Sequence, residues 1–141
     1  MKASPSTLPI RATAIVAMMT AAGIGLLSRT EPIRDLPAVG SWTGDTAWAV
    51  AAYFLVRLIL PTARIRTVAL LAAALCLTVE LSQLIQAEWL ENLRRHRIVA
   101  LLIGRGFLWI DLARYALGVV IAMGADRILR PDLPATPAHN R

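Results

Sequence analysis

Long apolar runs separated by short polar segments make up most of this chain. Each run is close to the ~20 residues that a helix needs to cross the hydrocarbon core of a bilayer, and the four runs are residues 12–28, 45–60, 67–85 and 107–125. Helices that cross a membrane one after another must alternate in direction. The pattern therefore predicts an all-α, polytopic membrane protein whose four transmembrane helices form an antiparallel bundle.

The segments between the runs carry turn-forming and charged residues. Residues 30–44 contain Pro32, Pro37 and Gly40, and we interpret this segment as a loop. In residues 86–97, apolar and basic positions recur at helical spacing. This spacing favours a helix lying at the membrane interface before the last span, although the polar composition fits a solvated loop as well.

The division of the chain follows from these runs. We expect residues 1–11 to form an N-terminal tail, residues 12–126 a single transmembrane domain, and residues 127–141 a disordered tail with several prolines and no apolar periodicity. A cleaved signal peptide is the competing interpretation of the first run. Because the run does not end in a small-residue cleavage site, we expect its helix to be retained.

Composition excludes several classes of protein. Hydrophobic residues make up 57% of the chain and charged residues only 17%, against roughly 25% charged residues in a soluble domain. A water-soluble enzyme is therefore not expected. The net charge of +6 would suggest nucleic-acid binding in a polar protein, but here the basic residues cluster at the ends of apolar runs, where they anchor helices to lipid head groups. We expect the lipid bilayer, and not a nucleic acid, as the partner.

Polar residues inside the runs gather at one end of the predicted bundle. In an antiparallel arrangement, the start of the second span, the end of the third and the start of the fourth lie in the same half of the bilayer. The spacing of Arg114 from Asp111 also allows an ion pair. The residues that this places together are Asp45, Glu80, Gln83, Asp111, Arg114 and Tyr115. Arg57, near the other end of the second span, is expected to extend toward the head groups.

Orientation rests on the connection between the second and third spans. This connection, residues 61–66, is short, and its charged residues, Arg64 and Arg66, are both basic. Such a loop favours placing the connection and both termini in the cytoplasm. The predicted polar cluster would then face the extracytoplasmic side.

Ionisable groups within spans are costly to insert, by roughly 2.5–3.5 kcal/mol for a central charge, and are candidate functional groups for that reason. They can also act only as contacts between helices. We therefore expect a polar cluster that binds a lipid or an envelope precursor without catalysing a reaction. An alternative is an intramembrane enzyme in which Glu80 is the general acid or base and Asp111 with Arg114 orients a lipid-linked head group. A proton-coupled transporter would require a homo-oligomer.

Other kinds of site have little support. His96 and His139 are the two histidines of the chain. One lies in a basic segment and the other in the expected disordered tail, so we predict no metal site and no cofactor. Cys76 lies in an apolar run and is expected to behave as a small hydrophobic residue. Gly118 and Ala122 have the spacing of helix-packing positions.

Several short strings, taken in order, resemble the bacterial domain of unknown function 2809 (DUF2809) family over residues 15–123. The strings are GLLSR at 25–29, GDTAW at 44–48, ELSQL at 80–84, GFLWID at 106–111 and YALG at 115–118. The resemblance implies a small integral protein of the bacterial inner membrane with no assigned reaction. Glu80, Gln83 and Asp111 also follow the order found in VanZ-like membrane proteins, which implies a role at the cell envelope.

Overall fold

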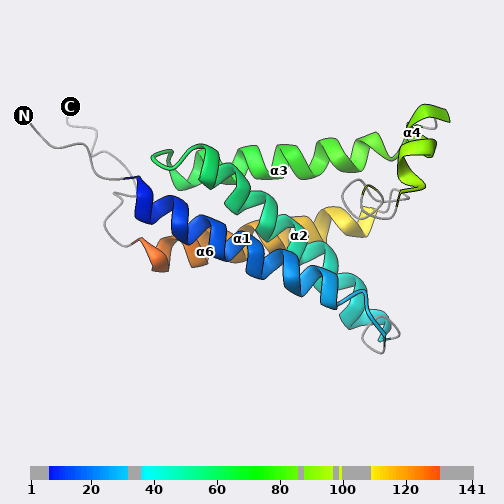
Figure 1. Ribbon diagram of the computed structural model, residues 1–141, viewed down its shortest axis with the longest axis horizontal. Helices are drawn as coiled ribbons and strands as arrows, with labels where there is room; N and C mark the ends of the chain where they lie inside the picture. Colours follow the sequence, from blue (N-terminus) through cyan, green and yellow to red (C-terminus); the bar gives the residue numbers. More distant parts are fainter. Residues whose placement is uncertain (1–6, 32–35, 86–87, 97–98, 100–108, 131–141) are drawn as a thin grey trace, which may run out of the picture.

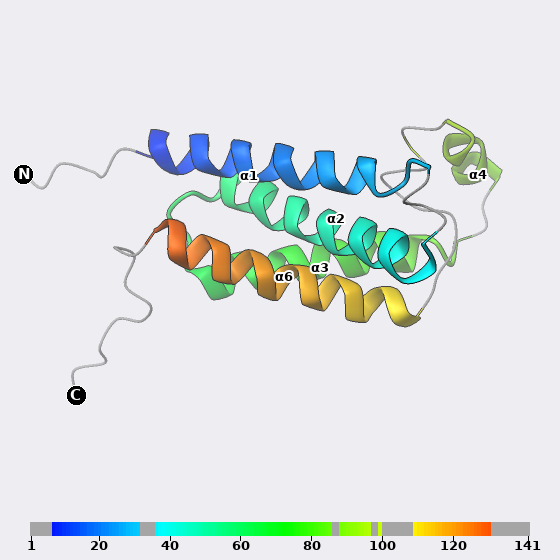
Figure 2. The same ribbon diagram turned by 90° about the horizontal axis from the view of Figure 1, so that it is seen from below.

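The computed structural model describes residues 7–31, 36–85, 88–96, 99 and 109–130. Its helices are α1 (Leu8–Leu27), α2 (Pro37–Ile59), α3 (Ile65–Ser82), α4 (Glu88–Arg94) and α6 (Trp109–Leu129). The four long helices lie side by side and alternate in direction, and α4 lies beyond one end of them (Figures 1 and 2). In the described part of the chain there is no strand, so the predicted all-α class is confirmed.

Helix α2 is the central helix of the bundle. It packs against α1, α3 and α6, and α3 also packs against α6. Its side chains are buried at consecutive positions, as at residues 51–54, which requires neighbours on every side of the helix. Cys76 and Val68 of α3 belong to the same hydrophobic core, and the expected role of Cys76 as a small hydrophobic residue is confirmed.

Small residues allow α6 to approach α2 closely. A Cβ atom on Gly118 would lie 2.6 Å from the Cβ of Ala49 and closer still to the carbonyl oxygen of Thr46. Ala122, one turn further along α6, is fully buried. The predicted packing role of Gly118 and Ala122 is therefore confirmed. The close contact at Gly118 determines where along α2 the helix α6 packs.

We expect Gly118→Ala to destabilise the protein by about 1–3 kcal/mol, because the new methyl group must push α6 away from α2. Gly124→Ala, on the same helix, is the matched control, since nothing lies within 4 Å of its added Cβ atom. That control should gain up to about 1 kcal/mol from helix propensity. Thermal unfolding of the purified variants, followed by circular dichroism, measures both effects, and a Gly118→Ala protein as stable as Gly124→Ala would contradict the packing.

The helix ends differ from the expected spans. Helix α2 begins at Pro37, so the prediction of a loop over residues 30–44 is wrong for its last eight residues. Proline fits the first turn of a helix, where its fixed φ is favourable and its missing N–H has no partner to lose. Asp45 therefore does not begin a helix but lies two turns inside α2.

The other ends shift by smaller amounts. Helix α1 begins four residues before the expected span, α3 ends three residues early, and α6 continues four residues past residue 125. The connection before the last span does contain a helix, α4. The prediction of a disordered tail at 127–141 is wrong for residues 127–129, which belong to α6. Residues 131–141 of that tail and residues 107–108 of the predicted last span lie outside the described residues.

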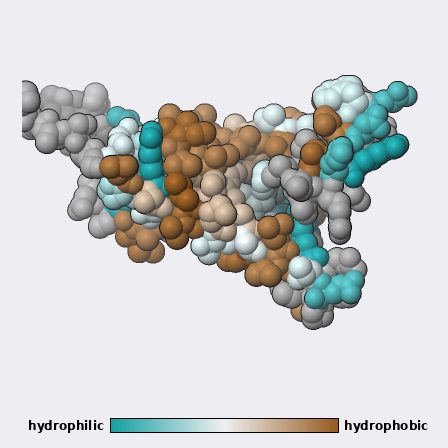
Figure 3. Space-filling view, viewed as in Figure 1, coloured by the Kyte–Doolittle hydropathy of each residue, from teal (hydrophilic) through white to brown (hydrophobic). Residues whose placement is uncertain are grey.

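The outer surface of the bundle is strongly apolar. Large side chains such as Val16, Leu70 and Val120 are mostly exposed, and hydrophobic side chains cover much of the middle of the face in Figure 3, while hydrophilic ones gather near α4. Helices α1 and α3 are long and apolar enough to cross a membrane. These two helices indicate membrane association.

Candidate functional site

Arg114 of α6 lies between two carboxylates from two helices. Its Nη1 donates to Asp111 Oδ1 at 2.6 Å, one turn earlier on α6, and to Asp45 Oδ2 on α2 at 2.9 Å. The guanidinium carbon also lies 5.4 Å from the centroid of the Trp42 ring, a cation–π distance. The ion pair expected from the spacing of Asp111 and Arg114 is therefore confirmed.

The edge of this group carries a second cation. Arg29, just after the end of α1, lies 3.8 Å from Asp45 Oδ1 through its Nη2, which is too long for a hydrogen bond. The Arg29 side chain is 41% exposed, against 11% for Arg114. Asp45 thus lies between a tightly paired arginine and a loosely held one.

Glu80 of α3 is fully buried at the same end of the bundle. The Tyr115 hydroxyl donates to Glu80 Oε2 at 3.0 Å and joins α3 to α6. Gln83 follows as the C-cap of α3, where its backbone N–H bonds the carbonyl oxygen of Glu80. The structure thus places Asp45, Asp111 and Arg114 in direct contact and Glu80 with Tyr115 beside them; we call these five residues the Arg114 cluster.

A second polar cluster, not predicted from the sequence, lies at the opposite end of α2 and α6. Asp126 is 1% exposed and Arg57 is 0% exposed. Asp126 Oδ2 accepts hydrogen bonds from the Tyr53 hydroxyl at 2.8 Å and from Arg57 Nε at 3.1 Å. The expectation that Arg57 extends toward the head groups is wrong, because the arginine points into the bundle toward a carboxylate.

The same carboxylate also ties down the connection between α2 and α3. Arg130 pairs with Asp126 Oδ1 and donates to the carbonyl oxygen of Pro61. Arg57 donates to the carbonyl oxygen of Ala63. We call Tyr53, Arg57, Asp126 and Arg130 the Asp126 cluster. Because successive long helices alternate in direction, α2 and α6 run in the same direction and finish at the same end of the bundle, so the order of the helices could have brought this pair together from sequence.

The two clusters join α2 to α6 at two heights. Asp45 and Arg57 are twelve residues apart on α2, which corresponds to about 18 Å along a helix. At each height, a charge on α2 meets the opposite charge on α6. Five charged side chains of these two helices are therefore paired inside the bundle, namely Asp45, Arg57, Asp111, Arg114 and Asp126, whereas Arg127 of α6 is exposed.

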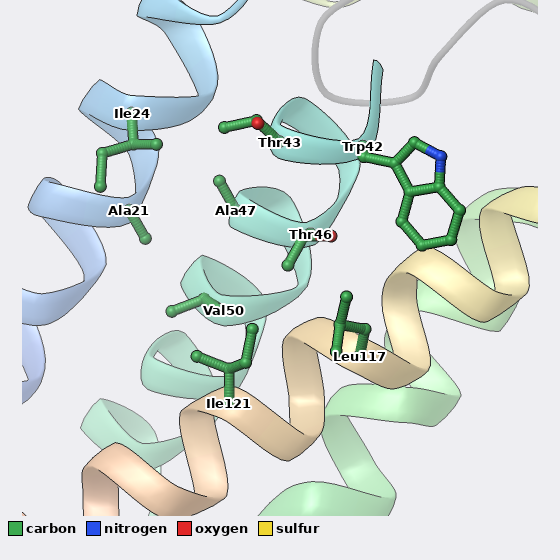
Figure 4. A pocket seen from close by; sticks show the side chains of 9 residues that line it. All are labelled: Ala21, Ile24, Trp42, Thr43, Thr46, Ala47, Val50, Leu117 and Ile121. Carbon is green, nitrogen blue, oxygen red and sulfur yellow. The ribbon is translucent and has the colours of Figure 1, made fainter. Parts of the chain in front are cut away.

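An apolar cleft of about 410 Å³ lies between α1, α2 and α6. Figure 4 shows Ala21 and Ile24 on the α1 side, Leu117 and Ile121 on the α6 side, and α2 between them. Trp42 belongs both to this lining and to the surroundings of Arg114. The cleft and the Arg114 cluster therefore adjoin each other.

Among the residues that the structure describes, no three histidine, cysteine, aspartate or glutamate side chains are grouped as metal ligands. Glu80, the residue considered as a general acid or base, is enclosed by the bundle, and the Tyr115 hydroxyl bonds to its carboxylate. Arg29, next to Asp45, is an accessible charged group at the edge of the Arg114 cluster.

No solved structure matches this chain. A family model described as "Protein of unknown function (DUF2809)" matches residues 34–119, which is more than half of the chain. The match covers α2, α3, α4 and the first half of α6, with all five residues of the Arg114 cluster. The chain belongs to the DUF2809 family, as its sequence strings indicate.

Proposed function

We propose that the protein is an integral protein of the bacterial inner membrane in which α1, α2, α3 and α6 all cross the bilayer. We further propose that the Arg114 cluster, with Arg29, binds the phosphate-bearing head group of a lipid or lipid-linked envelope precursor. The protein acts in this proposal as a binding protein.

The distribution of side chains supports four crossings. Fully buried positions include Arg57, Glu80 and Asp126, whereas many large aliphatic side chains face outward. A water-soluble helical bundle has the opposite arrangement. In a bilayer, charged side chains face the bundle interior and pair with one another, and the ion pairs between α2 and α6 do so.

The observation that carries the head-group proposal is the geometry around Asp45. Arg29 approaches this carboxylate only to 3.8 Å and keeps 41% of its side chain exposed. A guanidinium in this position can turn toward a phosphate, with which arginine forms short, charge-assisted hydrogen bonds. On the other side, Arg114 holds Asp45 through a hydrogen bond and itself lies over the Trp42 ring. A head group that binds Arg29 would thus meet a fixed polar surface.

We expect Arg29→Gln to reduce the amount of phospholipid that stays bound to the purified protein by about tenfold, the loss that corresponds to ~1.4 kcal/mol. Native mass spectrometry of protein extracted from bacterial membranes measures this occupancy. Arg66→Gln, which removes an exposed arginine at the start of α3, is the matched control and should keep the lipid. Equal lipid retention by the two variants would contradict the role of Arg29.

A further inference from the structure

We infer that the cleft between α1, α2 and α6 holds one acyl chain of the phospholipid whose phosphate lies at Arg29. This inference rests on the proposed function and adds to it the place of the hydrocarbon part of the ligand. The binding site would then be a continuous surface, polar at Arg29 and apolar along the cleft.

The cleft has the chemistry that a hydrocarbon chain requires. Its walls are mostly aliphatic side chains from three helices, joined by Trp42, Thr43 and Thr46 of α2. Its volume of about 410 Å³ falls within the ~300–1,000 Å³ range of ligand sites in proteins. Ala21 and Ala47 line it with single methyl groups, which leaves the space open. On its α6 side, Leu117 and Ile121 are partly exposed on the outer surface.

The position of Arg29 relative to the cleft selects a phospholipid as the occupant. Ile24 of the cleft lining lies in the last turn of α1, and Arg29 follows the end of that helix by two residues. Its Nε lies 3.5 Å from the place of a Cβ atom on Gly44, which is the neighbour of Thr43 in the cleft lining. A cation thus lies beside one end of the apolar cleft. An amphiphile with an anionic head and a hydrocarbon tail matches both parts.

The surroundings also favour a lipid from the bilayer. The cleft opens between α1, which is apolar enough to cross a membrane, and α6, which exposes Val120 and Leu117. In the proposed orientation of the bundle, acyl chains are the material in contact with this surface. A chain that enters sideways loses no contact with hydrocarbon and gains close contact with the walls.

The test follows the fluorescence of Trp42, which lines the cleft. Replacing Trp48, Trp89 and Trp109 with Phe leaves Trp42 as the single tryptophan. Phosphatidylglycerol with dibrominated acyl chains is then added to this protein in detergent. Bromine quenches tryptophan on contact, and we expect saturable quenching. Ile121→Phe, which places a rigid ring on the wall of the cleft, should weaken the apparent affinity at least fivefold.

Val120→Phe is the matched control, because Val120 adjoins Ile121 on α6 and is exposed but does not line the cleft. It should leave the quenching curve unchanged. Leu117→Phe, on the same wall as Ile121, repeats the test at a second position if Ile121→Phe lowers the melting temperature. Equal quenching in the Ile121, Leu117 and Val120 variants would overturn the inference.

Two further outcomes separate this inference from the proposed function. If the protein retains phospholipid in an Arg29-dependent manner but Ile121→Phe and Leu117→Phe leave the quenching of Trp42 unchanged, the head-group site stands and the acyl chain lies elsewhere. If the Trp42 emission instead follows protein concentration together with dimer formation, the cleft is a contact between two copies. Either result overturns the acyl-chain site, whereas loss of all lipid retention in the unaltered protein would overturn the proposed function itself.

Discussion

Asp126→Ala is expected to destabilise the protein by about 3–5 kcal/mol, the usual result of removing one partner of a buried ion pair. Arg57 is 0% exposed and has Asp126 as its carboxylate partner. Without Asp126, the bundle would enclose an uncompensated positive charge, and the Tyr53 hydroxyl would lose its acceptor. Thermal unfolding in detergent measures the loss.

The control for this prediction is Arg127→Ala, which removes an exposed charge at the next position of α6. It should change stability by less than about 0.5 kcal/mol. The double variant Arg57→Met with Asp126→Leu should recover most of the loss, because replacing a whole buried pair by apolar side chains is often neutral. A single Asp126→Ala variant as stable as the Arg127→Ala protein would show that the pair does not hold α2 to α6.

Arg114→Met is expected to cost about 1.5–3 kcal/mol, the range for hydrogen bonds to charged groups. The change leaves the carboxylates of Asp45 and Asp111 close together without the cation that joins them. Repulsion between like charges in a poorly solvated site adds to the loss of the two hydrogen bonds.

Replacing Asp45 and Asp111 by neutral side chains tests whether their repulsion causes part of this loss of stability. In the Arg114→Met background, Asp45→Asn together with Asp111→Asn should restore part of the lost melting temperature, since the repulsion disappears. Arg66→Met removes an exposed arginine and serves as the control. If Arg114→Met and Arg66→Met have equal melting temperatures, the ion pairs of Arg114 contribute nothing to the bundle.

The sequence was sufficient to predict the helical class and the five residues of the Arg114 cluster, while Gln83, which was expected with them, is the C-cap of α3. Four apolar runs near the length of a span predicted four long helices, and their alternation in direction placed Asp45, Glu80 and Asp111 at one end. The order of the helices alone places these residues at the same end of the bundle, because it determines the direction in which each helix runs. The pairing of Asp111 with Arg114 followed from their spacing on one turn.

The helix ends and the Asp126 cluster were missed, although the order of the helices places Arg57 and Asp126 at the same end of the bundle. Proline and glycine in residues 37–44 suggested a loop, yet Pro37 begins α2, since proline interrupts a helix only beyond its first turn. Arg57 near the end of a run was assigned to the interface, because long cations commonly extend there. Whether such a side chain turns inward depends on a partner from another helix, here Asp126.

The direct test of four crossings is cysteine labelling in a Cys76→Ala background. Single cysteines replace Thr7, Thr30 and Thr62, which lie beside the ends of the long helices, Asn92, which lies in α4, and Thr136, which follows α6 in the sequence. An impermeant maleimide is added to intact cells, and then to permeabilised cells as the control for reactivity. With both termini in the cytoplasm, Thr30 and Asn92 should label in intact cells and Thr7, Thr62 and Thr136 should not. If only α1 and α3 cross, Thr30 and Thr62 would share one side and Thr7 and Asn92 the other, and that result would contradict the four-span bundle.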